Sequence, residues 1–152
     1  MAARIRVELD GLKEVRDSLS NLIARSNDLT PAMASIGELL LLSHDERFTS
    51  QTAPDGTPWQ SLSETTQGMK PRNSSLILTL NANLRKLSYN ASAKSLEFGS
   101  NEPYAAMHQF GGTTSPRSMI PNKQIPARPF LGVSKSDEEG ILSALSDYLM
   151  QL

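Results

Sequence analysis

Apolar residues recur at helical spacing near both ends of this chain, whereas its middle offers only short apolar runs broken by proline and glycine. Within residues 12–23 and 33–40, spacings of three and four residues predict one apolar stripe on each of two amphipathic helices. A third stripe, over residues 141–149, predicts a C-terminal helix. Helices that flank short strands and loops are typical of the α+β class.

Four short segments predict a small antiparallel sheet. Residues 4–9 alternate apolar and polar side chains, and residues 87–91 and 96–99 have the pattern of a hairpin. Residues 128–134 follow a proline-rich stretch, so we expect an edge strand there. We predict one α+β domain over residues 1–152, with the sheet packed against two N-terminal helices and one C-terminal amphipathic helix.

Local signals predict where two of these helices begin and end. In the pair Thr30-Pro31, Thr30 is expected to be the N-cap and Pro31 to lie in the first turn. This helix should end near Phe48. Ser136 or Asp137 is expected to cap the C-terminal helix.

Two polar segments, residues 49–75 and 111–124, are rich in Gly, Pro and Ser. Ser63 is expected to cap a short helix within the first segment. The apolar run 76–80 that follows is compatible with a strand or a helix. Long loops of this composition are often mobile in a free subunit and become ordered when the subunit docks. We expect both segments to become ordered on assembly.

Two absences from the sequence exclude whole classes of protein. The chain has no cysteine, which excludes disulfides and thiolate metal sites. The longest apolar run, residues 39–42, is far shorter than the roughly 20 residues that a membrane helix needs. We therefore expect a chain that is made in the cytoplasm and does not enter a membrane.

The charges are distributed in three blocks although the net charge is only −1. Residues 1–64 hold six basic and ten acidic side chains, and residues 137–152 hold four acidic and no basic ones. Residues 65–136 hold nine basic and two acidic side chains. The basic block either pairs with the acidic helices, within the subunit or in a neighbour, or faces DNA.

No group of residues in the sequence predicts catalysis. A zinc site needs three or four converging ligands, and the chain has only two histidines, His44 and His108. We interpret His44 as a solvated residue near a helix end and His108 as a hydrogen-bonded packing residue, with catalysis by His108 as the alternative. Neither a Gly-x-Ser-x-Gly elbow nor a glycine-rich phosphate loop is present. We expect no enzyme, no cofactor and no metal.

Three strings of residues resemble, in the same order, the phage virion morphogenesis family, which includes Mu-type morphogenesis proteins and P2-type tail-completion proteins. They are RF at 47–48 with PDGTPWQSLS at 54–63, FGSN at 98–101 with YAA at 104–106 and HQFGG at 108–112, and IPARPFLG at 125–132. The resemblance covers roughly residues 33–150. One departure follows residue 79, where the family tends to have Thr-Gly and this chain has Leu-Asn-Ala-Asn.

The resemblance implies a structural protein of the neck or tail end of a virion, assembled in the host cytoplasm. It implies a homo-oligomeric ring, which we expect to be a hexamer, between the connector or head-completion protein and the tail tube or tail terminator. Genomic DNA would pass through the lumen without specific binding. The candidates for assembly contacts are Trp59, His108, Phe110, Arg128 and Phe130.

Arg128 is the strongest of these candidates because Pro126 and Pro129 fix the backbone around it. Its guanidinium is suited to a bidentate contact with a carboxylate. Two other functions stay open beside the neck protein. One is a capsid-assembly or head-morphogenesis factor, and the other is a DNA-binding module that uses the basic block.

Overall fold

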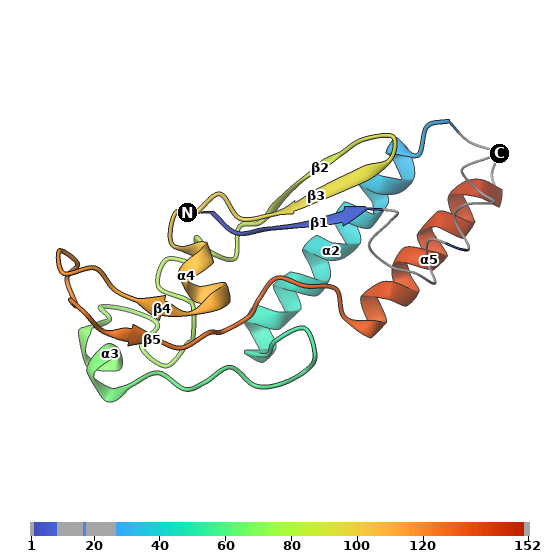
Figure 1. Cartoon of the computed structure of the whole chain (residues 1–152). Helices are drawn as coiled ribbons and strands as arrows, with labels where there is room; N and C mark the ends of the chain where they lie inside the picture. The colour runs from blue at the N-terminus through green and yellow to red at the C-terminus, as the bar shows by residue number, and fades with distance from the viewer. Residues whose placement is uncertain (1, 9–16, 18–26, 151–152) are drawn as a thin grey trace.

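The computed structural model describes residues 2–8, 17 and 27–150, and it has the predicted α+β architecture (Figure 1). Apart from residue 17, the predicted first helix lies outside the described residues, as does the last residue of the predicted strand 4–9. The described helices and strands are β1 (Arg4–Glu8), α2 (Thr30–Ser50), α3 (Glu64–Met69), β2 (Ser88–Ala91), β3 (Ser95–Gly99), α4 (Ala105–Phe110), β4 (Gly112–Thr113), β5 (Gln124–Ile125) and α5 (Lys135–Met150).

The long helix α2 lies between the sheet and α5, and its buried face forms the centre of the core (Figure 1). The sheet is antiparallel in the order β1-β3-β2, with Phe98 of β3 opposite both Ile5 and Tyr89. Phe98 is fully buried against α2, where its ring contacts the ring of His44 at 4.6 Å between centroids. The hairpin predicted at 87–91 and 96–99 is confirmed.

The predicted edge strand at residues 128–134 is wrong. This segment is extended but pairs with no strand, so the main sheet has three strands among the described residues. Pro129 removes one backbone N–H that a ladder would need. The neighbouring backbone groups bond to side chains instead, as described below for the candidate site.

Two loop regions differ from the patterns in the sequence. Residues 76–80 form neither strand nor helix but a series of turns, in which Leu78 has a φ of 55°. In the stretch that replaces the family's Thr-Gly, the positive φ falls on Ala82 (59°) and not on either asparagine. Residues 112–113 and 124–125 form a second, two-stranded hairpin that the sequence did not reveal.

Of the three predicted helix caps, two are wrong and one is confirmed. Thr30 lies inside the first turn of α2, and the carboxylate of Asp28 accepts hydrogen bonds from its N–H (3.0 Å) and hydroxyl (2.5 Å). Ser134 begins α5 by a reciprocal capping box with Asp137, each side chain accepting from the other's N–H at 3.0 Å. Ser63 caps α3 as predicted, accepting from the N–H of Thr66 at 3.2 Å. No helix in the described part of the chain is long and apolar enough to cross a membrane.

Gly37 allows α2 to approach the sheet closely, and this generates a stability prediction. A Cβ at Gly37 would lie 2.6 Å from the ring of Tyr89, whose hydroxyl donates to Glu38 at 2.8 Å. We expect Gly37→Ala to destabilise the fold by about 1–3 kcal/mol through overpacking, despite its better helix propensity. Urea unfolding measures this change.

Gly68→Ala is the matched control, because nothing lies within 4 Å of its Cβ position in α3. It should be neutral or stabilise by up to about 1 kcal/mol. Equal effects of the two substitutions would show that α2 does not need a glycine against Tyr89.

Candidate functional site

The extended segment 128–132, which we call the clamped segment, is held by side chains from three distant parts of the chain. They come from the end of α2, from Trp59 and from α4. Sequence strings that resemble the virion morphogenesis family therefore meet at one place in the fold. Two of the three strings contribute side chains that hold the backbone of the third.

Arg47 of α2 holds the end of the clamped segment. Its Nη1 donates to the carbonyl oxygens of Phe130 (3.1 Å) and Gly132 (2.8 Å), and its Nη2 donates to Asp137 Oδ2 at 2.6 Å. The Arg47 and Asp137 side chains are only 7% and 4% exposed. Burial lowers the pKa of Arg47, while the carboxylate of Asp137 opposes that shift. This buried pair joins α2, the clamped segment and α5.

His44 completes the cluster, and its predicted exposure is wrong. The side chain is fully buried one turn before Arg47. Its Nε2 accepts from Arg47 Nη1 (2.9 Å) and from the Gly132 N–H (3.3 Å), and neither group can accept a bond. The proton is therefore on Nδ1, which donates to the Leu40 carbonyl at 2.7 Å. Burial, followed by the positive charge of Arg47, lowers the pKa of His44 to about 4.

Gln109 of α4 holds the middle of the clamped segment in the way that a neighbouring strand would. Its Oε1 accepts from the N–H groups of Phe130 (3.0 Å) and Leu131 (2.9 Å), and its Nε2 donates to the Leu131 carbonyl at 3.0 Å. Gln109 was not among the predicted site residues. Its place in HQFGG was the only signal in the sequence.

Trp59 and Phe130 form the apolar part of the site. Trp59 is buried, its Nε1 donates to the Pro129 carbonyl at 2.7 Å, and its ring meets Phe48 edge-on at 5.4 Å. Phe130 is fully buried and packs its ring 5.8 Å from that of Phe48. Both candidates for assembly contacts therefore make these contacts within the subunit.

Arg128 makes a two-pronged contact, but its partners are not a carboxylate. Its Nε and Nη2 donate to the carbonyls of Gln60 (2.7 Å) and Ser61 (3.1 Å), and its own N–H donates to the His108 carbonyl at 2.7 Å. The residue is 6% exposed, and burial lowers its pKa. Arg128 thus ties the segment 60–61 to α4.

His108 and Phe110 lie on different faces of α4. His108 is half-buried, and its Nδ1 is a buried atom with no hydrogen-bond partner among the described residues. Burial and the charge of Arg128 lower its pKa. Phe110 is 74% exposed, so it is the candidate whose side chain is free to meet another protein.

One member of the basic block pairs with an acidic helix, as predicted. Arg85 forms an ion pair with Asp45 on α2, including an Nη2 to Oδ2 contact of 3.0 Å, and also donates to Thr49 Oγ1 at 2.8 Å. Lys70 instead donates to the carbonyls of Leu76 (2.6 Å) and Thr79 (2.7 Å). Two members of the basic block, Lys70 and Arg128, thus bond to the subunit's own backbone.

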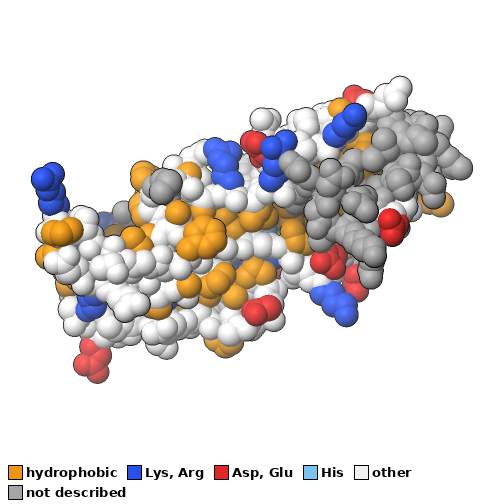
Figure 2. All heavy atoms as spheres, viewed as in Figure 1, with side chains coloured by type: hydrophobic (Ala, Val, Ile, Leu, Met, Phe, Trp, Pro, Cys, Tyr) orange, Lys and Arg blue, Asp and Glu red, His pale blue; other side chains and the backbone are white. Residues whose placement is uncertain are grey.

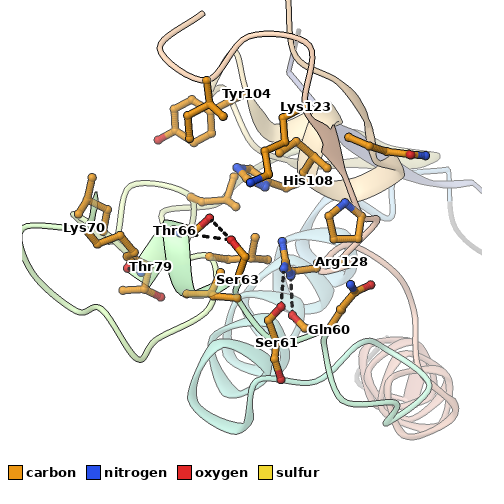
Figure 3. A pocket seen from close by; sticks show the side chains of 18 of the residues that line it. Gln60, Ser61, Ser63, Thr66, Lys70, Thr79, Tyr104, His108, Lys123 and Arg128 are labelled. Carbon is orange, nitrogen blue, oxygen red and sulfur yellow. Dashed lines mark hydrogen bonds between the residues drawn. The ribbon is translucent and has the colours of Figure 1, made fainter. Parts of the chain in front are cut away.

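A cavity of about 700 Å³ lies beside the clamped segment (Figure 3). His108 faces it from α4 and Tyr104 from the position just before that helix. Arg128 faces it from the clamped segment, and Lys70 and Lys123 from the surrounding loops. The residues that line it include no Asp or Glu. The described part of the chain has no group of three or more residues that could hold a metal ion.

Comparison with known proteins connects this geometry to a family. The phage virion morphogenesis family matches residues 10–150. The chain belongs to the phage virion morphogenesis family. This membership confirms the resemblance carried by the three strings. No solved structure gives a significant match.

The curated relatives in this family are similar over almost their whole length. The chain is 28% identical to the Mu-like prophage FluMu G protein 2 of Haemophilus influenzae, covering 97% of this chain and 98% of the relative. It is 31% identical to the putative capsid assembly protein G of Escherichia phage Mu, over 93% of this chain and 86% of the relative. It is 32% identical to the tail completion protein S of Escherichia phage P2, over 90% of this chain and 99% of the relative. A role in phage assembly follows.

The buried ion pair of this family member gives a prediction about stability. Asp137→Asn keeps the shape of the side chain but leaves the Arg47 guanidinium buried without its counter-charge. We expect a loss of about 3–5 kcal/mol. Asp45→Asn is the control, because it breaks the exposed pair with Arg85 and should cost less than about 1 kcal/mol. Urea unfolding that gives similar losses for both variants would contradict the importance of the buried pair.

The depressed pKa of His44 predicts the sign of a pH dependence. Between its ordinary value of 6.5 and about 4, the unfolded chain binds a proton that folded His44 does not. The contribution of His44 to the free energy of unfolding is therefore fully present above pH 6.5. It falls as the pH drops, by up to about 3 kcal/mol at pH 4. His108, whose pKa is also lowered, contributes in the same direction.

Measuring the free energy of unfolding between pH 7.5 and about 5 avoids most carboxylate titration. His44→Gln should make the free energy of unfolding less dependent on pH. His108→Gln should remove its own, independent part of that dependence. If His44→Gln keeps the slope of the wild type, the depressed pKa of His44 is refuted.

Proposed function

We propose that this chain is a structural protein of the head–tail joining or tail-completion apparatus, without enzymatic activity. It acts as a homo-oligomeric ring, a hexamer, at the neck or tail end of the virion. Its neighbours are the connector or head-completion protein on one side and the tail tube or tail terminator on the other. The tail completion protein S of phage P2, of which the match covers 99%, supports this proposal.

The observation that carries the proposal is the use of polar side chains at the candidate site. Four of these side chains bond to backbone carbonyls or N–H groups of loops and extended segments: Arg47, Gln109, Trp59 and Arg128. Such bonds fix a chain path. A catalytic site would instead direct its activated groups toward a substrate.

The arrangement around His108 also favours a packing role over a catalytic one. A general base needs an orienting partner and a nucleophile within hydrogen-bond reach. His108 Nδ1 has no partner among the described residues, and the nearest aromatic contact is the Tyr104 ring at 6.0 Å. A packing role for His108 fits this environment.

A capsid-assembly or head-morphogenesis factor is the second candidate, because the phage Mu relative is described as a putative capsid assembly protein. Both candidates act by shape and contact. A DNA-binding module has less support, because Arg85, Arg128 and Lys70 already bond within the subunit. DNA that passes through a ring lumen needs no specific contact with these side chains.

An amber mutation in the gene of this chain, within its phage, separates the two candidates. We expect lysates with DNA-filled heads and complete tail tubes that are not joined, visible by electron microscopy. Adding the purified protein to such a lysate should restore infectious particles. Antibody labelling of those particles should place the protein at the neck or tail end.

Absent or misshapen heads with normal tails would contradict the proposed role and favour the head-morphogenesis factor. A matched control is the same mutant complemented with Asp45→Asn protein, which should be folded and active.

A further inference from the structure

The cavity beside the clamped segment has the chemistry of a docking surface for an acidic, partly apolar partner. Lys70, Lys123 and Arg128 line it, and no acidic residue does. Lys70 and Arg128 already donate to backbone carbonyls of the subunit. The Lys123 ammonium makes no hydrogen bond or ion pair with any described residue, so it is available to a partner. Apolar side chains that include Leu80 and Ile125 form much of the remaining wall.

Exposed apolar side chains gather around this cavity. Of the nine large hydrophobic side chains exposed among the described residues, Leu80 and Tyr104 line the cavity. Others lie within two positions of a lining residue in the sequence, among them Met69, Leu76 and Met119. Figure 2 shows that hydrophobic side chains also gather over and beside the position of α4 in Figure 1. An apolar rim of this kind indicates a protein contact.

The outer face of α5 has the complementary chemistry. After Lys135 and Ser136 in its first turn, the exposed residues of α5 fall on one side of the helix and combine acidic, apolar and small polar side chains: Glu139, Leu142, Ser143, Ser146, Asp147 and Met150. Leu142 is 37% exposed and Met150 is 82% exposed. The opposite side of α5, with Ile141 and Leu145, is buried against α2. We call the exposed side the acidic face of α5.

These two surfaces lie at opposite ends of the molecule. The loops and the β4–β5 hairpin that surround the cavity occupy one end, and the C-terminal half of α5 occupies the other (Figure 1). The two surfaces of one copy therefore cannot meet each other. Two different surfaces that recognise each other between copies form a heterologous contact, which closes into a ring when the rotation permits.

We propose that the acidic face of α5 of one copy docks over the cavity of a second copy. Leu142 and Met150 cover the apolar rim, while Glu139 and Asp147 face Lys123, the lining cation whose ammonium has no partner among the described residues. The charges set the register of the contact, and the apolar side chains supply most of its free energy. This inference rests on the proposed function in that it names the contact from which the ring is built.

Sedimentation velocity on the full chain and two variants tests the contact. Lys123→Glu alters the cavity, and the double variant Leu142→Gln, Met150→Gln alters the acidic face. We expect the wild type to form closed oligomers and each variant alone to associate at least tenfold more weakly. Mixed one to one, the variants should form a dimer that does not grow, because only one of the two possible contacts has both surfaces intact.

Matched controls use the same chemical changes elsewhere. Lys94→Glu lies in the β2–β3 turn, and Leu42→Gln replaces an α2 side chain that is 73% exposed. Both should associate as the wild type does. Circular dichroism and urea unfolding of all variants show that each is folded before association is compared.

Three results would overturn the proposal. They are a wild-type chain that stays monomeric up to millimolar concentration, variants that associate like the wild type, and a mixture that forms no dimer. In each case the cavity would belong to another occupant, such as an acidic segment of a different virion protein. The amber-mutant experiment is independent, since joining of heads and tails can succeed or fail whichever surfaces form the ring.

Discussion

A buried guanidinium that must keep all its hydrogen bonds is the constraint on which this structure depends. Arg47 can remain charged in the core only while Asp137, two carbonyls and His44 Nε2 surround it. Those partners belong to α5, the clamped segment and α2. The requirement therefore fixes how three elements that are distant in the sequence pack together. Gln109 and Trp59 extend the same principle along the clamped segment, replacing a strand partner with side chains.

The sequence predicted correctly those elements that depend on residues close together in the chain. Predictions failed where the structure depends on contacts between residues far apart in the sequence. Helices α2, α3 and α5 and the β2–β3 hairpin follow from apolar spacing, cap residues and turn residues, and they are confirmed. His44 looked solvated because its neighbours Asp45 and Glu46 are polar. Nothing local shows that the carbonyl of Phe130 and the N–H of Gly132 come to that side of α2. Residues 128–134 were predicted to be a strand because the sequence does not show what their backbone bonds to. In the folded chain that partner is the side chain of Gln109 and not another strand.

The candidate site was predicted in part. Trp59, Arg128 and Phe130 were chosen for their place among prolines and glycines, and they do meet in space. Their partners are the subunit's own backbone and rings. The family strings thus have a physical explanation in this chain: they hold the backbone of the clamped segment in one path. A rigid path presents the neighbouring cavity and Phe110 in a fixed geometry, which is what an assembly protein needs.

The amide protons of the clamped segment test this account most directly. Residue-resolved hydrogen exchange by NMR on the free subunit can compare Phe130 and Leu131 with the amides of β3. Although they lie outside any strand, both amides should be protected to a similar degree, because Gln109 Oε1 accepts from each of them. Exchange as fast as that of exposed turn residues would contradict the claim that side chains from distant strings hold this segment in place.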